Sequence, residues 1–422
     1  MKRFIFVLCL LALLVAPVVG VVAQDGDGDS DGEMMGCPPG PVPEDAPVIK
    51  FGAAVSDTGK YAREGGDTRN GYTLWLEWVN EEHGGIYVDG TCYRAEIIFY
   101  DDESDPDTVS VLTERLIVED GVDFILGPYS SSLTQVASVI TERENVIMVE
   151  GNGASDSLFE RGFQNLFAVL TPASYYTRSG IELAYEMGAR TAVVAYEDTA
   201  FPTSVAEGAQ HWLEELGFEI LAVESYPKDV TDVTAMFTNF RELDPDLFVG
   251  GGHFNDAVLF LNTARELGFE PDAFLITVGP SNPTFVEEMG DTANFVLGAA
   301  QWDPSLAYED EWFGSASDYA ERYEERFGIP PSYQAAESTA TALVLHQAIE
   351  MAGSLDTDAV RQALLDMELE TFYGPIDFDE TGKNVGKPMV TIQIQDGEIL
   401  VVAPEDAAVA EPVWPMPGWD ER

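Results

Sequence analysis

Basic residues are scarce in this chain. Against 75 acidic residues there are only 21 lysines and arginines, which gives a formal net charge of −54 over 422 residues. Nucleic acids and anionic membranes are polyanions, so this composition excludes both as partners. It fits adaptation to high salt, where ions screen the self-repulsion, and it equally fits an acidic lineage without that adaptation. The lysines form no cluster; they are Lys2, Lys50, Lys60, Lys228, Lys383 and Lys387.

Histidine is also rare, and the motifs of common enzymes are missing. The four histidines are scattered along the sequence, so we expect no metal site. Neither a Gly-x-Ser-x-Gly elbow nor a Walker-type phosphate loop is present. Asp101-Asp102-Glu103 offers paired carboxylates, but it follows a predicted strand and precedes a helix cap, which favours a structural role. We therefore expect no catalytic residue, no cofactor and no enzymatic activity.

A long apolar run occurs only at the N-terminus. Lys2 and Arg3 precede apolar residues 4–22, and small residues come before a cleavage point ahead of Gln24, as in a signal peptide. No other stretch is long and apolar enough to span a bilayer. We expect residues 1–23 to be removed and the protein to be exported to the periplasm or the cell surface. Cys9 and Cys37 are both poorly placed to carry a lipid anchor.

Residues 24–46 are rich in Asp, Gly and Pro and are predicted to form a solvated linker. The run from Asp25 to Asp29 resembles the start of a calcium loop, but it lacks the glutamate that such a loop needs at its twelfth position. Only Cys37 and Cys92 remain after cleavage. In an oxidising compartment a disulfide between them is the simplest account, and two free thiols are the alternative.

The rest of the chain alternates strands and helices, which predicts an α/β fold with parallel sheets covered on both faces. The length favours two lobes. Strands are predicted at 48–55, 95–100, 124–126, 146–150, 165–169, 191–195, 219–223, 247–250 and 273–277, with helices between them. Three further helices are predicted at 315–327, 335–351 and 358–367. A strand pair at 389–395 and 399–403 turns at Asp396-Gly397.

Open parallel sheets bind ligands beyond the carboxyl ends of their strands. Two such sheets facing each other would form a cleft, bordered by the loops at 58–66, 127–132, 150–157, 197–203, 250–255 and 278–282. The stretch from Gly127 to Ser132 combines serine hydroxyls with the N-terminus of a predicted helix, a combination that suits a small anionic group. Simple capping of that helix by the serines is the alternative.

Several motifs occur in a recognisable order. They are Ser56-Asp57-Thr58-Gly59, Gly84-Gly85-Ile86, the run from Tyr100 to Pro106, Gly127-Pro128-Tyr129-Ser130-Ser131-Ser132, Gly250-Gly251-Gly252-His253, Val278-Gly279-Pro280 and the run from Thr371 to Asp379. In their order and spacing, residues 48–404 resemble the branched-chain amino-acid type of periplasmic solute-binding protein, the substrate-capturing component of an ABC importer.

The resemblance implies two Rossmann-like lobes joined by three crossovers, the type 1 periplasmic binding protein fold, which closes on a small solute. It also implies a monomer that works with a membrane permease. Applied to this chain, it predicts lobe 1 at 47–170, lobe 2 at 171–300, a return to lobe 1 at 301–372, closing strands of lobe 2 at 373–404 and a tail at 405–422.

The resemblance also assigns ligand contacts. Ser131 matches the family's serine that contacts the ligand carboxylate, and Phe201 matches the second-lobe aromatic that covers the ligand. Ala154 falls where many members have a threonine, and Ser281 stands where amino-acid binders often place the acid that pairs with the ligand's ammonium. Glu64 replaces an aromatic residue. The remaining expected contacts are Tyr129, Ser130, Asn152, Gly153, Ser155, His253, Trp302 and Tyr333.

Glu64 decides between two ligand classes. If its carboxylate faces the cleft, it supplies the negative charge that Ser281 lacks, and an amino acid or related amine remains the expected ligand. If it faces solvent, the pocket suits an amide or a short carboxylate instead. A sensor of such solutes, which reports to a membrane partner, is the alternative function.

Overall fold

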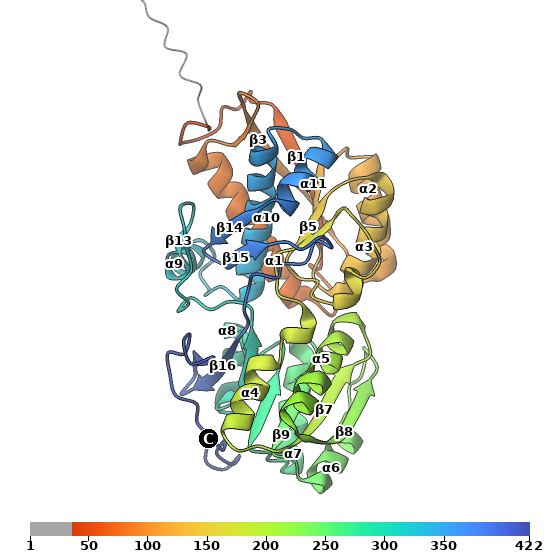
Figure 1. The fold of residues 1–422 in the computed structure, drawn as a ribbon, viewed down its shortest axis with the longest axis vertical. Helices are drawn as coiled ribbons and strands as arrows, with labels where there is room; N and C mark the ends of the chain where they lie inside the picture. Colours follow the sequence, from red (N-terminus) through yellow and green to blue (C-terminus); the bar gives the residue numbers. More distant parts are fainter. Residues whose placement is uncertain (1–35) are drawn as a thin grey trace, which may run out of the picture. The chain divides into compact units, whose positions relative to one another are not determined.

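The computed structural model describes residues 36–422, which form one compact unit. The predicted signal peptide at 1–23 and most of the predicted linker, residues 24–35, lie outside the described residues. None of the helices between residues 36 and 422 has the length and apolar character that crossing a membrane requires. Two large sheets, each covered by helices, dominate the described chain (Figure 1).

The first sheet has six strands in the order β2-β3-β1-β4-β5-β6. All pair in parallel except the edge strand β2, which forms an antiparallel hairpin with β3. The strands are β1 (Val48–Val55), β2 (Ile86–Val88), β3 (Thr91–Asp101), β4 (Phe124–Leu126), β5 (Met148–Glu150) and β6 (Leu166–Ala168). This order confirms the predicted parallel arrangement.

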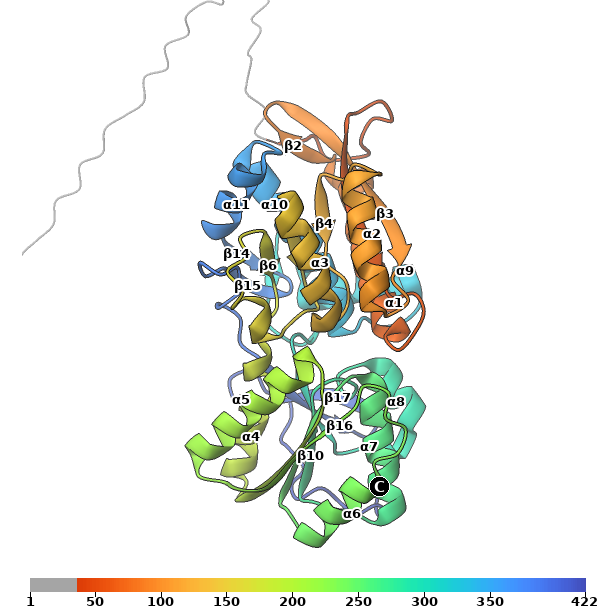
Figure 2. The same cartoon turned by 90° about the vertical axis from the view of Figure 1, so that its right-hand side faces the viewer.

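Helices cover both faces of this sheet because its short strands are apolar on both sides. Phe124 and Leu126 pack into one core with α1 and α10, whereas Ile125 between them packs into a second core with α2 and α3. Figures 1 and 2 show these two helix pairs on the sheet. The helices are α1 (Ala62–Trp78), α2 (Pro106–Val118), α3 (Ser131–Glu144), α10 (Tyr333–Ala352) and α11 (Thr357–Leu365), with a π-helical segment (Val79–His83) that continues α1.

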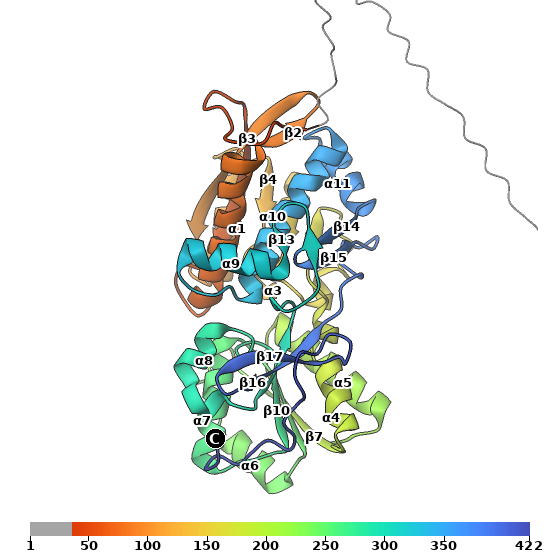
Figure 3. The same cartoon turned by 90° about the vertical axis from the view of Figure 1, so that its left-hand side faces the viewer.

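The second sheet has seven strands in the order β17-β16-β11-β10-β9-β7-β8. Five strands are parallel, and the hairpin β16–β17 adds to one edge in the antiparallel sense (Figure 3). The strands are β7 (Thr191–Glu197), β8 (Glu219–Tyr226), β9 (Leu247–Gly251), β10 (Ala273–Ile276), β11 (Leu297–Ala300), β16 (Val390–Gln395) and β17 (Glu398–Ala403). The helices are α4 (Arg178–Glu186), α5 (Ala200–Leu216), α6 (Thr234–Leu243), α7 (Phe254–Leu267) and α8 (Pro283–Met289).

The predicted fold class is therefore confirmed, and the differences concern short elements. The hairpin turns at Asp396-Gly397 as predicted, with φ angles of 52° and 81° that suit a two-residue turn. The sequence analysis missed β11 and α8. Four further short strands form two small hairpins outside the large sheets, and α9 (Ala316–Phe327) follows the first of them; the strands are β12 (Glu309–Asp310), β13 (Gly314–Ser315), β14 (Glu368–Thr371) and β15 (Gly374–Asp377).

Three connections join the two sheets, and hydrogen bonds tie them together. The Thr171 N–H donates to Gln301 Oε1 at 3.1 Å, and Gln301 Nε2 donates to the Thr171 carbonyl at 2.9 Å. The Thr171 hydroxyl donates to the Lys387 carbonyl at 2.8 Å. The last connection thus passes Lys387 and enters the second sheet at β16. The boundary expected at 372–373 lies in the turn between β14 and β15, and these two strands pair with each other.

The predicted disulfide between Cys37 and Cys92 is present. Cys92 lies at the start of β3, so the bond fastens the segment that precedes β1 to the hairpin β2–β3. Gly84 lets this segment approach, because an added Cβ there would lie 2.1 Å from the Pro38 carbonyl oxygen. The alternative of two free thiols is wrong.

Candidate functional site

The loop after β4 provides the serines that the sequence singled out. Gly127 ends the strand where no side chain fits, since an added Cβ would lie 2.1 Å from the Cβ of Glu150. Ser130 has a φ of 80°, which is rare for a residue other than glycine, and its hydroxyl caps α3. Ser131 is fully buried, and its Oγ accepts a 2.9 Å hydrogen bond from the Ser155 N–H. Strained backbone of this kind is concentrated at functional sites.

The loop after β5 is held in place by a buried carboxyl group. Glu150 Oε2 accepts hydrogen bonds from the N–H groups of Asn152 and Gly153. Burial raises the pKa of Glu150 to about 8, although these hydrogen bonds act in the opposite direction. The Oγ of Ser155 lies 2.8 Å from the Oγ of Ser204 on α5 of the second lobe. This loop therefore contacts both lobes.

Glu64 lies in the first turn of α1 and faces the second lobe. Its side chain is only 2% exposed. Its Oε1 accepts hydrogen bonds from the Phe254 N–H at 3.2 Å and from the Tyr129 hydroxyl at 3.4 Å. Among residues 36–422 it forms no ion pair, and its charged neighbours, Asp67 and Asp256, are both acids. Burial raises the pKa of Glu64 to about 7. The carboxyl group is thus buried between the lobes without a cation.

Aromatic side chains from both lobes surround the Tyr129 hydroxyl. Nδ1 of His253, at the start of α7, lies 3.0 Å from this hydroxyl. The His253 ring centroid lies 4.7 Å from that of Tyr61 and 5.7 Å from that of Phe201, which in turn packs edge-on against Tyr176. Burial, with Lys60 and Lys228 nearby, lowers the pKa of His253 well below its usual range. This histidine therefore contributes a neutral aromatic surface.

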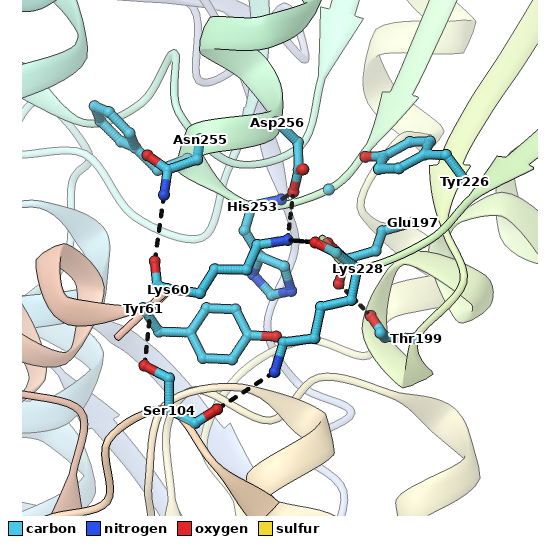
Figure 4. Close-up of polar contacts among 12 residues, drawn as sticks. Lys60, Tyr61, Ser104, Glu197, Thr199, Tyr226, Lys228, His253, Asn255 and Asp256 are labelled. Atoms are coloured by element: carbon cyan, nitrogen blue, oxygen red, sulfur yellow. Dashed lines mark hydrogen bonds and ion pairs between the residues drawn. The ribbon is translucent and has the colours of Figure 1, made fainter. Parts of the chain in front are cut away.

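Beside this group, two lysines form contacts between the lobes (Figure 4). The Lys60 ammonium, from the loop before α1, pairs with Glu197 and lies 3.5 Å from Asp256, both in the second lobe. Lys228, of the second lobe, donates to the Ser104 carbonyl of the first lobe at 3.3 Å. Burial raises the pKa values of Glu197 and Asp256, and for Glu197 the neighbouring Asp256 adds to the effect. We call Lys60, Glu197 and Asp256 the lysine latch.

The remaining expected contacts lie elsewhere. Ser281, Trp302 and Tyr333 line a separate pocket of about 420 Å³. The Trp302 indole donates to the Phe372 carbonyl at 2.9 Å, which gives it a structural role. Tyr333 also lies close enough to Tyr129 to help raise the pKa of its hydroxyl. The Ala154 carbonyl accepts from the N–H of Ala173 at 2.7 Å. The structure thus brings together Glu64, Tyr129, Phe201 and His253, and it joins Ser131 to Ser155, while Ser281 and Trp302 line a pocket with Tyr333.

Sequence reasoning missed the lysine latch. Lys60 and Glu197 lie on loops that were expected to border the cleft, and Asp256 follows a third. The only sequence signal for the lysine latch was the small number of lysines. Lys60 is one of only six lysines in the chain, and it lies in a loop that was expected to border the cleft. The scatter of lysines along the sequence concealed this.

Two α/β lobes, joined by three connections and meeting at buried polar and aromatic loops, define a two-lobed solute-binding protein. Residues 48–398 match the family model described as periplasmic binding protein, and the chain belongs to that family. A curated relative, the Leu/Ile/Val-binding protein homolog 7 of Brucella suis biovar 1, is 25% identical over 385 residues, covering 86% of this chain and 93% of its own length.

Solved structures share the fold. The branched-chain amino-acid transporter substrate-binding protein LivJ of Streptococcus pneumoniae, in complex with isoleucine, has a TM-score of 0.75 at 21% identity, covering 85% of this chain and 100% of its own. A solute-binding protein of an ABC transporter from Rhodopseudomonas palustris, in complex with 3,4-dihydroxybenzoic acid, has a TM-score of 0.72 at 21% identity, covering 83% and 95%. The expected type 1 fold and the resemblance to the branched-chain amino-acid type are confirmed.

Proposed function

We propose that this protein is exported, captures an amino acid or an amino-acid-like amine between its lobes, and delivers it to an ABC importer. It performs no catalytic turnover. The observation that carries the ligand class is Glu64, a buried carboxylate at the lobe interface with no cation beside it in residues 36–422. A buried unpaired charge is costly, and a ligand ammonium would compensate it.

The other end of such a ligand also finds partners. The N-terminus of α3 and the Ser131 hydroxyl can donate to a carboxylate, as helix N-termini commonly do. Phe201 and the neutral His253 ring provide apolar surface for a side chain. The names of the curated relatives support an amino acid, and Glu64 takes over the charge that Ser281 lacks.

One observation favours the second candidate, a sensor that binds amides or short carboxylates and reports to a membrane partner. Burial raises the pKa of Glu64 to about 7, so a neutral Glu64 is accessible near neutral pH. A neutral carboxylic acid needs no ammonium and can donate a hydrogen bond to an uncharged solute. The dihydroxybenzoate complex of the Rhodopseudomonas protein illustrates that this fold also accommodates an acid without an amine.

A thermal-shift screen of amino acids, amides and short carboxylates separates the two. A solute at a hundred times its dissociation constant adds about 2.7 kcal/mol of stability. We expect amino acids to stabilise the wild type, and Glu64→Gln to weaken their binding by roughly a hundredfold, about 2.7 kcal/mol. Asp102→Asn, which removes another buried carboxyl group of the same lobe, is the matched control and should bind normally.

Equal stabilisation of wild type and Glu64→Gln by amino acids would show that Glu64 is not the counterion. A response only to uncharged or purely anionic solutes would favour the second candidate. Calorimetry with mass spectrometry should find one solute bound per chain and no product. Released product would contradict both proposals.

A further inference from the structure

Two of the four histidines, scattered in the sequence, meet in the first lobe. His83 ends the π-helical segment that continues α1. His346 and Glu350 lie one turn apart on α10, which packs along α1. One side-chain ligand atom from each of these three residues lies within 4.8 Å of the other two. The expectation of scattered histidines is therefore wrong for this pair.

His346 is the unusual member of the group. Its side chain is completely buried, and neither ring nitrogen makes a hydrogen bond with any of residues 36–422. Its Nε2 lies 3.1 Å from Glu350 Oε1, a contact that lacks the alignment of a hydrogen bond. Buried polar groups in native proteins nearly always have a partner. A buried imidazole whose Nδ1 has no partner among residues 36–422, and whose Nε2 contacts the Glu350 carboxylate beside a second histidine, therefore offers nitrogen atoms to a ligand.

The surroundings hold these side chains in place. The His83 ring stacks on Trp78 with centroids 4.5 Å apart, and it meets the His346 ring edge-on at 5.2 Å. The Tyr87 N–H of strand β2 donates to Glu350 Oε1 at 2.8 Å. Such outer hydrogen bonds orient carboxylates at metal sites. Aromatic packing alone would account for the ring positions, but it leaves the two His346 nitrogens unexplained.

We propose that His83, His346 and Glu350 bind a divalent transition-metal ion of the zinc class. Two imidazole nitrogens with one carboxylate oxygen suit Zn²⁺ and its neighbours, whereas Mg²⁺ and Ca²⁺ require oxygen ligands. Ligand atoms around zinc lie about 3.4 Å apart, given metal–ligand distances near 2.1 Å. The Nε2–Oε1 distance of 3.1 Å already suits such a site, and the 4.8 Å spread closes by side-chain rotation.

The site is separate from the solute cleft. Glu64 lies in the first turn of α1 and His83 lies beyond its last turn, so the two are separated by roughly 28 Å of helix at 1.5 Å per residue. A metal here would fasten the end of α1 to α10 and β2. It gives the first lobe a cross-link on the same side as the Cys37–Cys92 disulfide, which also fastens the β2–β3 hairpin. This inference does not depend on the identity of the solute.

Metal titration of the EDTA-treated full chain tests the proposal. Excess Mg²⁺ is present throughout, because it occupies sites on the acidic surface. Calorimetry measures the binding of added Zn²⁺, and the absorption spectrum of bound Co²⁺ is a second readout. We expect one equivalent per chain. His83→Gln should weaken Zn²⁺ binding by roughly tenfold to a hundredfold. His83 is partly exposed, so this variant is expected to keep its circular dichroism spectrum.

The chain supplies its own control. His211 and Glu215 have the same spacing as His346 and Glu350, with 3.5 Å between Nε2 and Oε2, but both are exposed. His211→Gln should therefore bind Zn²⁺ like the wild type. Glu350→Gln keeps an oxygen for the Tyr87 N–H and should also bind Zn²⁺ more weakly. The proposal is wrong if the wild type takes up no Zn²⁺ in excess Mg²⁺, or if His83→Gln binds as tightly as the wild type.

Discussion

Two sites with buried carboxyl groups at the interface between the lobes differ in their counterions. Glu197 and Asp256, of the second lobe, face Lys60 of the first lobe. Glu64, of the first lobe, faces the second lobe; it accepts hydrogen bonds from one N–H and one O–H group, and no lysine or arginine within residues 36–422 pairs with it. The first site receives one cation from the chain itself, whereas Glu64 has none within residues 36–422.

This difference suggests that two sites at one interface of a very acidic protein can have different roles when the lobes meet. The lysine latch needs nothing from outside, so it is available whenever the lobes meet. Glu64 becomes favourable only when it is protonated or when a cationic group enters beside it. Under the proposed function, the latch would favour contact between the lobes in general, whereas Glu64 would make that contact depend on the bound solute.

Removal of the latch lysine should have the largest effect. Lys60→Met leaves Glu197 and Asp256 buried without their cation whenever the lobes close. Loss of one partner of a buried pair costs about 3 to 5 kcal/mol, which corresponds to more than a hundredfold in affinity. The cost should appear in solute affinity, because the open protein can hydrate both acids. Calorimetry with an amino acid identified in the screen measures it.

The control for the latch is Lys383→Met. Lys383 lies 4.0 Å from Asp379 in a partly exposed pair, so its loss should change affinity less than twofold by the rule for surface pairs. If Lys60→Met binds as tightly as Lys383→Met, the latch has no role in closure, and the contrast with Glu64 disappears.

The pH dependence of stability should show that Glu64 lacks a counterion in the free protein. Burial raises the pKa of Glu64 from 4.5 to about 7, so the folded protein holds this proton more tightly than the unfolded chain. The resulting stability is complete below pH 4.5 and is lost as the pH rises towards 7. Without solute, the wild type should lose about 3 kcal/mol over this window relative to Glu64→Gln.

Urea unfolding of both proteins across this window measures the difference between them. Other buried acids also titrate there, and those that do not interact with Glu64 contribute equally to both curves and cancel. Glu311→Gln removes an exposed acid of the first lobe, and its free energy of unfolding should change with pH as that of the wild type does. A pH-independent difference for Glu64→Gln would mean that Glu64 is not an uncompensated buried acid.

Local sequence patterns and their order along the chain were sufficient to predict most of the fold. Strand β1 begins and ends where its apolar run does, at Val48 and Val55. Gly217 and Gly268 end α5 and α7 in the left-handed conformation that favours glycine after a helix. Short elements were missed, because β11 is only Leu-Gly-Ala-Ala, without the β-branched residues that signal a strand.

The candidate site was predicted only in part, and the reason is physical. The family resemblance singled out Ser131 and Glu64, and both side chains are buried in the structure. Pairs such as Lys60 with Glu197, or His83 with His346, depend on how distant segments pack, and no local period encodes them. Ser281 and Trp302 line a pocket with Tyr333, and their contact with a ligand stays a prediction.

The smallest expected effect comes from a single hydroxyl that joins the two sides of the cleft. The Tyr129 hydroxyl lies 3.4 Å from Glu64 Oε1 and 3.0 Å from His253 Nδ1, and its one hydrogen cannot serve both. When an ammonium occupies Glu64, the hydroxyl is free to donate to His253. Tyr129→Phe thus removes at most one donated hydrogen bond, about 1 kcal/mol or fivefold in the affinity for an amine. Tyr226→Phe makes the same change on the latch side, where the hydroxyl donates to the Gly251 carbonyl at 3.2 Å, and calorimetry should show a smaller loss. Equal losses in the two variants would mean that the Tyr129 hydroxyl does not distinguish the Glu64 side from the latch.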